Sequence, residues 1–184
     1  MNRFAVAIFG PTGVGKTSLS LKIAKDCGEI ISVDSRQVYK FMDIGTAKPS
    51  SDEMQSVPHH LIDIINPNEV ITAGLFKRLS EKIIYEILDK GKIPFLVGGT
   101  GLYFNALING LSNIPPVSEK TKKMVVERWD NEGQSKMFEL LSQVDEAFSK
   151  RIHPNDKQRT LRVLEVYFET GKPISSFFEQ IKDK

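Results

Sequence analysis

The sequence predicts an α/β fold: a parallel sheet flanked by helices, followed by a small all-helical lobe. Up to Gly110, short continuous apolar runs alternate with helical patterns, which is typical of a parallel sheet covered on both faces. The first run leads into residues 10–17 (GPTGVGKT), which match the phosphate-binding pattern G-x-x-x-x-G-K-S/T at every fixed position. Beyond Gly110 no strand pattern is found. Together these observations predict a P-loop NTPase-like core with an inserted helical lobe.

The first strand is expected at residues 4–9 (FAVAIF), and the helix after the loop at residues 17–26. Backbone N–H groups of such a loop and of the helix N-terminus favour an anion at one spot. Lys16 adds a positive charge, and the Thr17 hydroxyl is placed to bind Mg²⁺. An ordinary glycine-rich turn that caps a helix is the alternative. The candidate phosphate contacts are Gly10, Pro11, Thr12, Gly13, Val14, Gly15, Lys16 and Thr17.

Three further strands and one long helix are expected in this half of the chain. Residues 29–33 (EIISV) form a short apolar run, and residues 60–65 are predicted to form another short strand. Apolar side chains recur at helical spacing over residues 73–90, which predicts an amphipathic helix. Residues 93–97 (IPFLV) are expected to be the last buried strand.

Polar or glycine-rich segments follow three of these strands, at residues 10–17, 34–37 (DSRQ) and 98–101 (GGTG). Ligands of doubly wound sheets bind beyond the carboxyl ends of the strands, so we expect the three segments to converge on one crevice. Asp34 is either the N-cap of a following turn or a carboxylate that contacts a metal or acts as a base, and its location favours the second. Thr100 is either part of a tight turn or a hydroxyl that contacts the ligand.

The second half is predicted to be helical. Residues 113–116 (NIPP) indicate a linker. Beyond it, helices are expected at residues 118–133, 134–144, 146–151 and 155–170. We therefore expect three parts: the P-loop core at residues 1–113, a helical lobe at 114–152, and a helix within 153–184 that returns to the core.

Composition restricts the class of protein only weakly. The 184 residues carry a net charge of +2, and 40% are hydrophobic, as in ordinary globular proteins. Basic residues cluster at 120–128 and 150–162, which indicates either solvated helix surface or contact with nucleic acid. Cys27 is the only cysteine, so no internal disulfide can form. No apolar run approaches the roughly 18 residues of a membrane span, so we expect a cytoplasmic protein with no membrane partner.

His59 and His60 do not predict a metal site, because adjacent side chains of an extended chain point to opposite sides. A structural role is expected for both. A kinase using the same loop is less favoured, because the strand at residues 93–97 ends in Gly-Gly-Thr rather than in an acidic metal ligand. No Ser-His-Asp or Cys-His arrangement is suggested by the sequence.

Five segments of the chain are informative together: GPTGVGKT at 10–17, DSRQVYKFMDIGTAKP at 34–49, VPHHLID at 57–63, LVGGTGLYFNALINGL at 96–111 and RIHPNDKQRTLRVLEVYFETGKP at 151–173. In this order they resemble the tRNA dimethylallyltransferases, also called tRNA isopentenyltransferases. The related adenylate-type enzymes share the loop and the PHH segment, but DSRQVY followed by IGTAKP favours the tRNA-modifying branch. Members of the family continue well beyond the last segment, so we expect this chain to lack a C-terminal part of the core.

The resemblance implies transfer of a dimethylallyl group from dimethylallyl diphosphate to the exocyclic amine of the adenosine next to the anticodon, at tRNA position 37. The tRNAs concerned read codons that start with U. The loop would bind the diphosphate, chiefly through Thr12, Lys16 and Thr17, with Thr17 also on Mg²⁺. Asp34 would be the general base, and Thr100 a further catalytic contact at the base and diphosphate.

The implied tRNA contacts come from both halves of the chain, and the helical lobe at 114–152 is expected to grip the anticodon stem. Lys122 stands where the family usually has Arg, and Lys cannot make the two-pronged phosphate contact of Arg. The contacts are Asp34, Ser35, Arg36, Gln37, Thr100, Lys122, Gln158, Arg159, Thr160, Leu161 and Arg162.

Two alternatives from other classes remain open. The first is a nucleotide or small-molecule kinase that uses the same phosphate loop. The second is a non-catalytic RNA-binding protein whose loop only senses phosphate. For all of these functions we expect a monomer.

Overall fold

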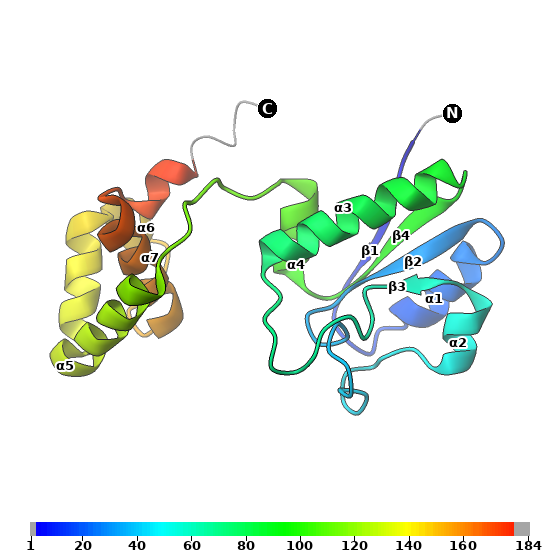
Figure 1. The fold of residues 1–184 in the computed structure, drawn as a ribbon, viewed down its shortest axis with the longest axis horizontal. Helices are drawn as coiled ribbons and strands as arrows, with labels where there is room; N and C mark the ends of the chain where they lie inside the picture. Colours follow the sequence, from blue (N-terminus) through cyan, green and yellow to red (C-terminus); the bar gives the residue numbers. More distant parts are fainter. Residues whose placement is uncertain (1–2, 179–184) are drawn as a thin grey trace. The chain divides into compact units, whose positions relative to one another are not determined.

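The computed structural model describes residues 3–178 and divides the chain into two compact units, residues 1–110 and 111–184 (Figure 1). The first unit contains the sheet, and the second is helical. The predicted α/β class is therefore confirmed, and up to residue 178 only helices follow the sheet. Within the described residues, no helix is both long enough and apolar enough to cross a bilayer.

Four parallel strands form the sheet of the first unit, in the order β1-β4-β2-β3. Gly98 of β4 pairs with Phe9 of β1 on one side and with Val33 of β2 on the other. The carboxyl ends of these three strands therefore lie level at one edge of the sheet. The strand bounds are Val6–Phe9 (β1), Gly28–Val33 (β2), His59–His60 (β3) and Ile93–Gly98 (β4).

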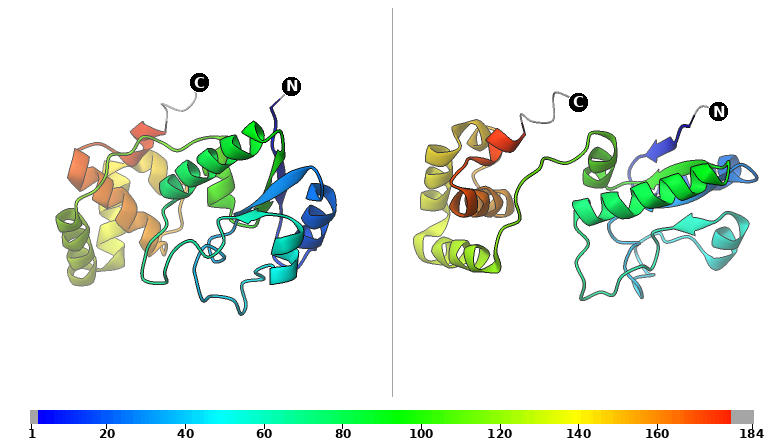
Figure 2. Two further views of the ribbon diagram at one scale, coloured as in Figure 1. Left: turned by 45° about the vertical axis from the view of Figure 1, so that its right-hand side comes forward. Right: turned by 45° about the horizontal axis from the view of Figure 1, so that its top comes forward.

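Helices cover both faces of this sheet (Figure 2). Successive side chains of a strand point to opposite faces. Ile30 packs in one cluster with Ala24 of the first helix, whereas Ile31 packs in another with Phe76 of the third. Helix α1 thus lies on one face, and α3 and α4 on the other. The helix bounds are Lys16–Ala24 (α1), Ser51–Ser56 (α2), Ala73–Asp89 (α3) and Gly101–Ile108 (α4).

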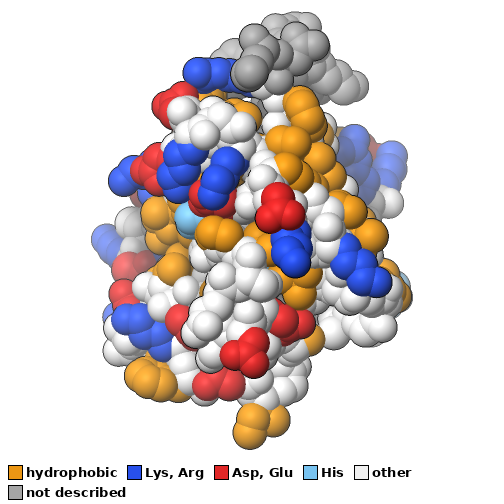
Figure 3. All heavy atoms as spheres, turned by 90° about the vertical axis from the view of Figure 1, so that its right-hand side faces the viewer, with side chains coloured by type: hydrophobic (Ala, Val, Ile, Leu, Met, Phe, Trp, Pro, Cys, Tyr) orange, Lys and Arg blue, Asp and Glu red, His pale blue; other side chains and the backbone are white. Residues whose placement is uncertain are grey.

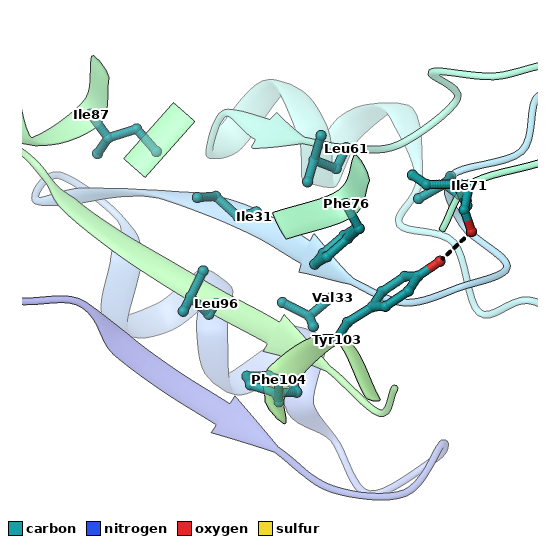
Figure 4. Close-up of a cluster of buried hydrophobic side chains, with 10 residues drawn as sticks. Ile31, Val33, Leu61, Ile71, Phe76, Ile87, Leu96, Tyr103 and Phe104 are labelled. Atoms are coloured by element: carbon teal, nitrogen blue, oxygen red, sulfur yellow. Dashed lines mark hydrogen bonds between the residues drawn. The ribbon is translucent and has the colours of Figure 1, made fainter. Parts of the chain in front are cut away.

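The larger core lies between the sheet and the pair α3 and α4 (Figure 4). The rings of Phe76 and Tyr103 stack with their centroids 4.0 Å apart. The Tyr103 hydroxyl donates a hydrogen bond to the Ile71 carbonyl at 3.5 Å, and Val33 belongs to the same buried cluster. This packing holds α4, and with it the strand-to-helix turn, beside the end of β2.

Two elements of the first unit differ from their prediction. The strand expected at residues 60–65 is limited to His59–His60, because Leu61 and Asp63 adopt left-handed backbone conformations (φ 62° and 54°). Helix α2 was not predicted. It begins with a capping box, in which the Ser50 side chain accepts from Glu53 N–H and the Glu53 carboxylate accepts from Ser50 N–H, and the S-x-x-E spacing was a readable signal for it.

The second unit is built mainly from two helices that pack together. Val125 and Met137 of α5 share a buried cluster with Val163 and Leu164 of α7. Gly133 (φ 81°) interrupts α5, where the sequence predicted two separate helices. The element bounds are Glu119–Val144 (α5), Glu146–Ser149 (α6), Lys157–Thr170 (α7) and a 3₁₀ turn at Ile174–Phe177 (η1).

The structure divides the chain after residue 110, and α7 belongs to the second unit. The apolar face of α7 packs against α5. The boundaries at residues 113 and 152 and the return of a C-terminal helix to the α/β core stay predictions. Residues 179–184 of the expected third part lie outside the described residues.

Candidate active site

The phosphate loop connects β1 directly to α1. Gly13 (φ 88°) and Gly15 (φ 85°) have left-handed backbone conformations, which glycine adopts without the strain that other residues incur. The N–H of Gly10 donates to the Gly98 carbonyl at 3.3 Å, which joins the loop to the end of β4. Lys16 is the first residue of α1, and its ammonium donates to the Pro11 carbonyl at 2.6 Å. The loop therefore places its charge at the helix N-terminus, as the sequence predicted.

The ends of β2 and β4 are also joined by hydrogen bonds. The N–H of Thr100 donates to the Val33 carbonyl at 3.2 Å, and the Thr100 hydroxyl accepts from Ser35 N–H at 2.9 Å. One oxygen of the Asp34 carboxylate accepts from Arg36 N–H at 2.8 Å. Thr100 is thus part of a tight turn, which was one of its two predicted roles, and its hydroxyl also positions the segment that carries Asp34.

A cleft of about 360 Å³ opens where the three strand ends meet. Its polar wall includes Lys16 and Thr17 of the loop and the carboxylate-bearing Asp34. Ile30 and Val97 contribute apolar surface. The structure therefore brings the phosphate loop and the predicted base into one cleft that can accommodate an anion beside a hydrocarbon group. Its lining residues from the predicted set are Thr12, Gly13, Gly15, Lys16, Thr17, Asp34 and Gln37.

Gln37 lines the cleft and is also bonded at both ends of its amide. Its oxygen accepts from the Ser32 hydroxyl at 2.8 Å, and its nitrogen donates to the carbonyls of Thr46 and Ala47 at 3.1 and 2.9 Å. The predicted RNA contact at this position is thus combined with a positioning role. Ser32 was not predicted, because a serine inside an apolar strand gives no sequence signal for a partner.

Lys48 is a second residue that the sequence did not single out by its chemistry. Its side chain is only 6% exposed, and its ammonium donates to Asp43 and Asp63 at 2.6 Å each and to the Tyr39 carbonyl at 3.1 Å. Burial alone lowers the pKa of Lys48, but the hydrogen bonds and charges of the two carboxylates outweigh it and raise the pKa. Lys48 therefore anchors the segment after Gln37 as a permanent cation.

The two histidines lie in different environments. His60 Nε2 is 2.7 Å from the Glu29 carboxylate, consistent with the predicted structural role. His59 instead lines the cleft, with its Nδ1 2.7 Å from the Val57 carbonyl. Burial lowers the pKa of His59, so this ring is neutral at pH 7 and adds a polar group without charge to the cleft wall.

The remaining predicted RNA contacts belong to the second unit. Gln158, Arg159 and Arg162 are exposed on α7, but Thr160 is fully buried. The side chain of Thr160 therefore cannot contact RNA, because it points into the core formed with α5, and Leu161 packs at the edge of that core. The three basic side chains are each paired with an acid on the same helix or its cap: Lys122 with Glu119, Arg159 with Asp156, and Arg162 with Glu165.

In this chain the ends of parallel strands converge on a glycine-rich loop at a helix N-terminus. This arrangement defines the class of P-loop phosphate-binding α/β proteins. Residues 37–184 match the family model described as IPP transferase. The chain belongs to this family.

Two curated relatives are similar to this chain over nearly its whole length. The chain is 46% identical over 183 residues to the tRNA dimethylallyltransferase of Fervidobacterium nodosum, covering 99% of this chain and 59% of that protein. It is 47% identical over 181 residues to the tRNA dimethylallyltransferase of a Staphylococcus aureus strain, covering 94% and 57%. The chain thus spans less than two thirds of the length of these curated relatives.

Solved structures give the same picture. The full-length tRNA isopentenylpyrophosphate transferase of Bacillus halodurans is 44% identical, with a TM-score of 0.59 over 94% of this chain and 57% of that one. A eukaryotic dimethylallyltransferase, captured acting on tRNA, is 32% identical, with a TM-score of 0.81 over 97% of this chain and 44% of that one. The P-loop NTPase-like fold of this chain is therefore shared with prenyl-transferring relatives.

Proposed function

We propose that this chain carries the donor site and part of the RNA surface of a tRNA dimethylallyltransferase. The reaction would move a dimethylallyl group from dimethylallyl diphosphate to the exocyclic amine of the adenosine at tRNA position 37, in tRNAs that read codons starting with U. The single observation that supports this most strongly is that Asp34 and the phosphate loop line the same cleft.

The transfer requires a diphosphate-binding site, which we call the anion cradle, and a proton-accepting base in the same cleft. A bond forms between the adenine nitrogen and the allylic carbon, while the bond from that carbon to the diphosphate oxygen breaks. Lys16 and the loop N–H groups would stabilise the charge that develops on the departing diphosphate. The adenine amine becomes acidic only as the new bond forms, and we assign Asp34 as the carboxylate that then takes its proton. The target base must leave its stack to reach this cleft.

The donor set of the cleft fits Mg²⁺. Mg²⁺ keeps several waters and binds few protein oxygens together with phosphate groups. Thr17 would hold the ion, because its hydroxyl belongs to the first turn of α1 and the residue lines the cleft. The part of the chain that the structure describes contains no group of three His, Cys, Asp or Glu side chains suited to enclosing a metal. A bound Mg²⁺ would neutralise charge on the diphosphate.

The second unit supplies the remaining tRNA surface in this proposal. Gln158, Arg159 and Arg162 form an exposed row on α7, and Lys122 lies near the start of α5. The Arg159 and Arg162 side chains are 66% and 44% exposed, although their partners Asp156 and Glu165 are only 21% and 15% exposed. Both partners are exposed in the Lys122–Glu119 pair. Such an exposed pair contributes at most about 1 kcal/mol, so an RNA phosphate can replace Glu119 at little cost.

The test is mass analysis of nucleosides from unmodified tRNA incubated with the purified protein, Mg²⁺ and dimethylallyl diphosphate. We expect the mass of one adenosine per tRNA to increase by one dimethylallyl group. Unchanged tRNA, together with phosphate transfer from ATP to a metabolite, would favour the kinase alternative. Tight RNA binding without any modification would favour the non-catalytic RNA-binding alternative.

A further inference from the structure

The segment between Gln37 and Lys48 exposes apolar side chains beside the cleft. Phe41 is 82% exposed and Ile44 is 99% exposed. Hydrophobic side chains project at the lower end of the face in Figure 3, the end at which Figure 1 draws this segment. We call residues 40–48 the apolar loop. Large apolar side chains held this far into water indicate a contact surface rather than a part of the core.

The apolar loop is fixed rather than loosely attached. Gln37 binds the carbonyls of Thr46 and Ala47, and the Thr46 hydroxyl donates to the Met42 carbonyl at 2.8 Å. Lys48 closes the loop through its bonds to Asp43 and to the neighbouring strand-end segment at Asp63. These bonds present the tip in one conformation, so a partner that binds it need not first order it.

Phe41 itself occupies an unusual backbone conformation. Its φ of 64° lies in the left-handed region, which is unfavourable for an aromatic residue. Such strain persists only where the surrounding structure enforces it, and it concentrates at functional sites. Packing does not explain the conformation, because the ring lies in solvent.

Two cations precede Phe41 in sequence, and Asp43, the nearest acid, is already paired with Lys48. Arg36 lies close to Phe41 in sequence and is exposed, Lys40 immediately precedes it, and Asp34 at the cleft is two residues before Arg36. Proteins that bind single-stranded RNA combine cations for the phosphates with aromatic rings on which unpaired bases stack. The apolar loop is continuous with Asp34–Gln37, the segment that we assign to the target base, and its Ala47 lines the cleft.

We infer that Phe41 is a stacking platform for an unpaired nucleotide that neighbours the extruded adenosine in the tRNA loop. This inference rests on the proposed function, because it assumes that RNA approaches the cleft. Stacking on Phe41 would add specificity. The protein would bind an RNA that has unpaired bases beside the target adenosine more tightly than a continuous duplex.

The test measures binding of an RNA hairpin with an unpaired loop, and of a fully paired duplex of equal length, at one fixed salt concentration. Loss of one base-stacking contact weakens binding by roughly 5- to 150-fold. We expect F41A to lose affinity for the hairpin by that factor and F41W to retain it, while duplex binding changes little. F41L keeps an apolar side chain without a ring and should behave like F41A. Y85A, which removes another exposed aromatic ring, on α3 (Tyr85 is 60% exposed), should bind as the unmodified protein does.

A second readout reports stacking directly. The chain contains one tryptophan, so F41W adds a single new fluorophore, and its emission should be quenched by the hairpin after subtraction of the signal from the unmodified protein. Equal hairpin affinity of F41A and the unmodified protein, or full retention by F41L, would overturn the stacking inference while leaving the proposed function intact. Failure of the unmodified protein to bind the hairpin at all would overturn both.

Discussion

Glu29 is a carboxylate buried at the start of β2, where three side chains satisfy it. His60 lies 2.7 Å from it, Lys92 3.1 Å and Lys90 3.2 Å. Burial alone raises the pKa of Glu29, but the hydrogen bonds from these partners outweigh burial and lower the pKa to about 2, against an ordinary value of 4.5. The ionised carboxylate therefore ties β2 to β3 and to the connection between α3 and β4.

This pairing predicts a pH dependence of stability. Because the folded pKa lies below the unfolded one, the contribution is complete above about pH 4.5 and is lost as the pH falls toward 2, for a total of roughly 3 kcal/mol. Urea unfolding between pH 5 and pH 2 measures it. E29Q should be less stable at pH 5 and should lose less stability over this range. Equal losses for E29Q and the unmodified protein would contradict the assignment.

Gly98 is a residue whose small size the sheet requires. A Cβ built on it would lie 2.0 Å from the Val33 carbonyl oxygen, and that oxygen accepts the hydrogen bond from Thr100. Any side chain here would push β4 away from β2 and disturb the turn that supports Asp34.

We therefore expect G98A to lower the free energy of unfolding by roughly 1–3 kcal/mol, as overpacked sites do, and to weaken binding of pyrophosphate. Urea unfolding and calorimetric titration with inorganic pyrophosphate measure the two effects. G101A is the matched control, because a Cβ there meets only the Phe9 ring, at 4.0 Å. A G98A protein as stable as G101A would show that the strands tolerate the added methyl group.

At the scale of elements, the apolar loop depends on Lys48. The ammonium of Lys48 donates to Asp43 within the loop and to Asp63 and the Tyr39 carbonyl outside it. The segments that it links contain left-handed residues at positions 41, 47, 61 and 63. These conformations need an anchor, because none of the four residues is glycine.

K48M should free the loop. We expect a loss of about 1–3 kcal/mol in the free energy of unfolding, because hydrogen bonds to charged groups are removed, together with faster cleavage by proteases within residues 41–47. Urea unfolding and limited proteolysis measure these effects. K82M on α3 is the control, since Lys82 is 76% exposed, and it should change stability by less than about 0.5 kcal/mol. Equal proteolysis of the two variants would argue against the anchor.

Local pattern predicted the elements that define the donor site, and failed where distant contacts decide the structure. The glycine-rich loop and the apolar runs of β1, β2 and β4 carry their own signals, so the convergence on one crevice followed from strand polarity. Left-handed conformations at Leu61 and Asp63 end β3 early, and neither residue is a glycine, which would have been the sequence signal for such a turn. The bonds of Gln37 and Lys48 link residues that no spacing rule relates, and the burial of Thr160 depends on how α7 packs against α5.

At the scale of the whole molecule, we assign the donor site to the first unit and part of the RNA surface to the second. Each has its own buried core, and every residue that lines the cleft belongs to the first. The proposed diphosphate contacts among the described residues therefore all belong to residues 1–110, while Gln158, Arg159 and Arg162 on α7 belong to the second unit. The base and the anion cradle are fixed relative to each other by the hydrogen bonds between the strand ends.

The most direct test compares D34N with the unmodified protein in a single experiment on unmodified tRNA and dimethylallyl diphosphate. Asn retains an oxygen for the Arg36 N–H but cannot take a proton. We expect dimethylallyl transfer to fall by roughly 10²–10⁴-fold, while the affinity for inorganic pyrophosphate stays unchanged. Transfer by D34N at the rate of the unmodified protein would contradict the assignment of the base to this cleft.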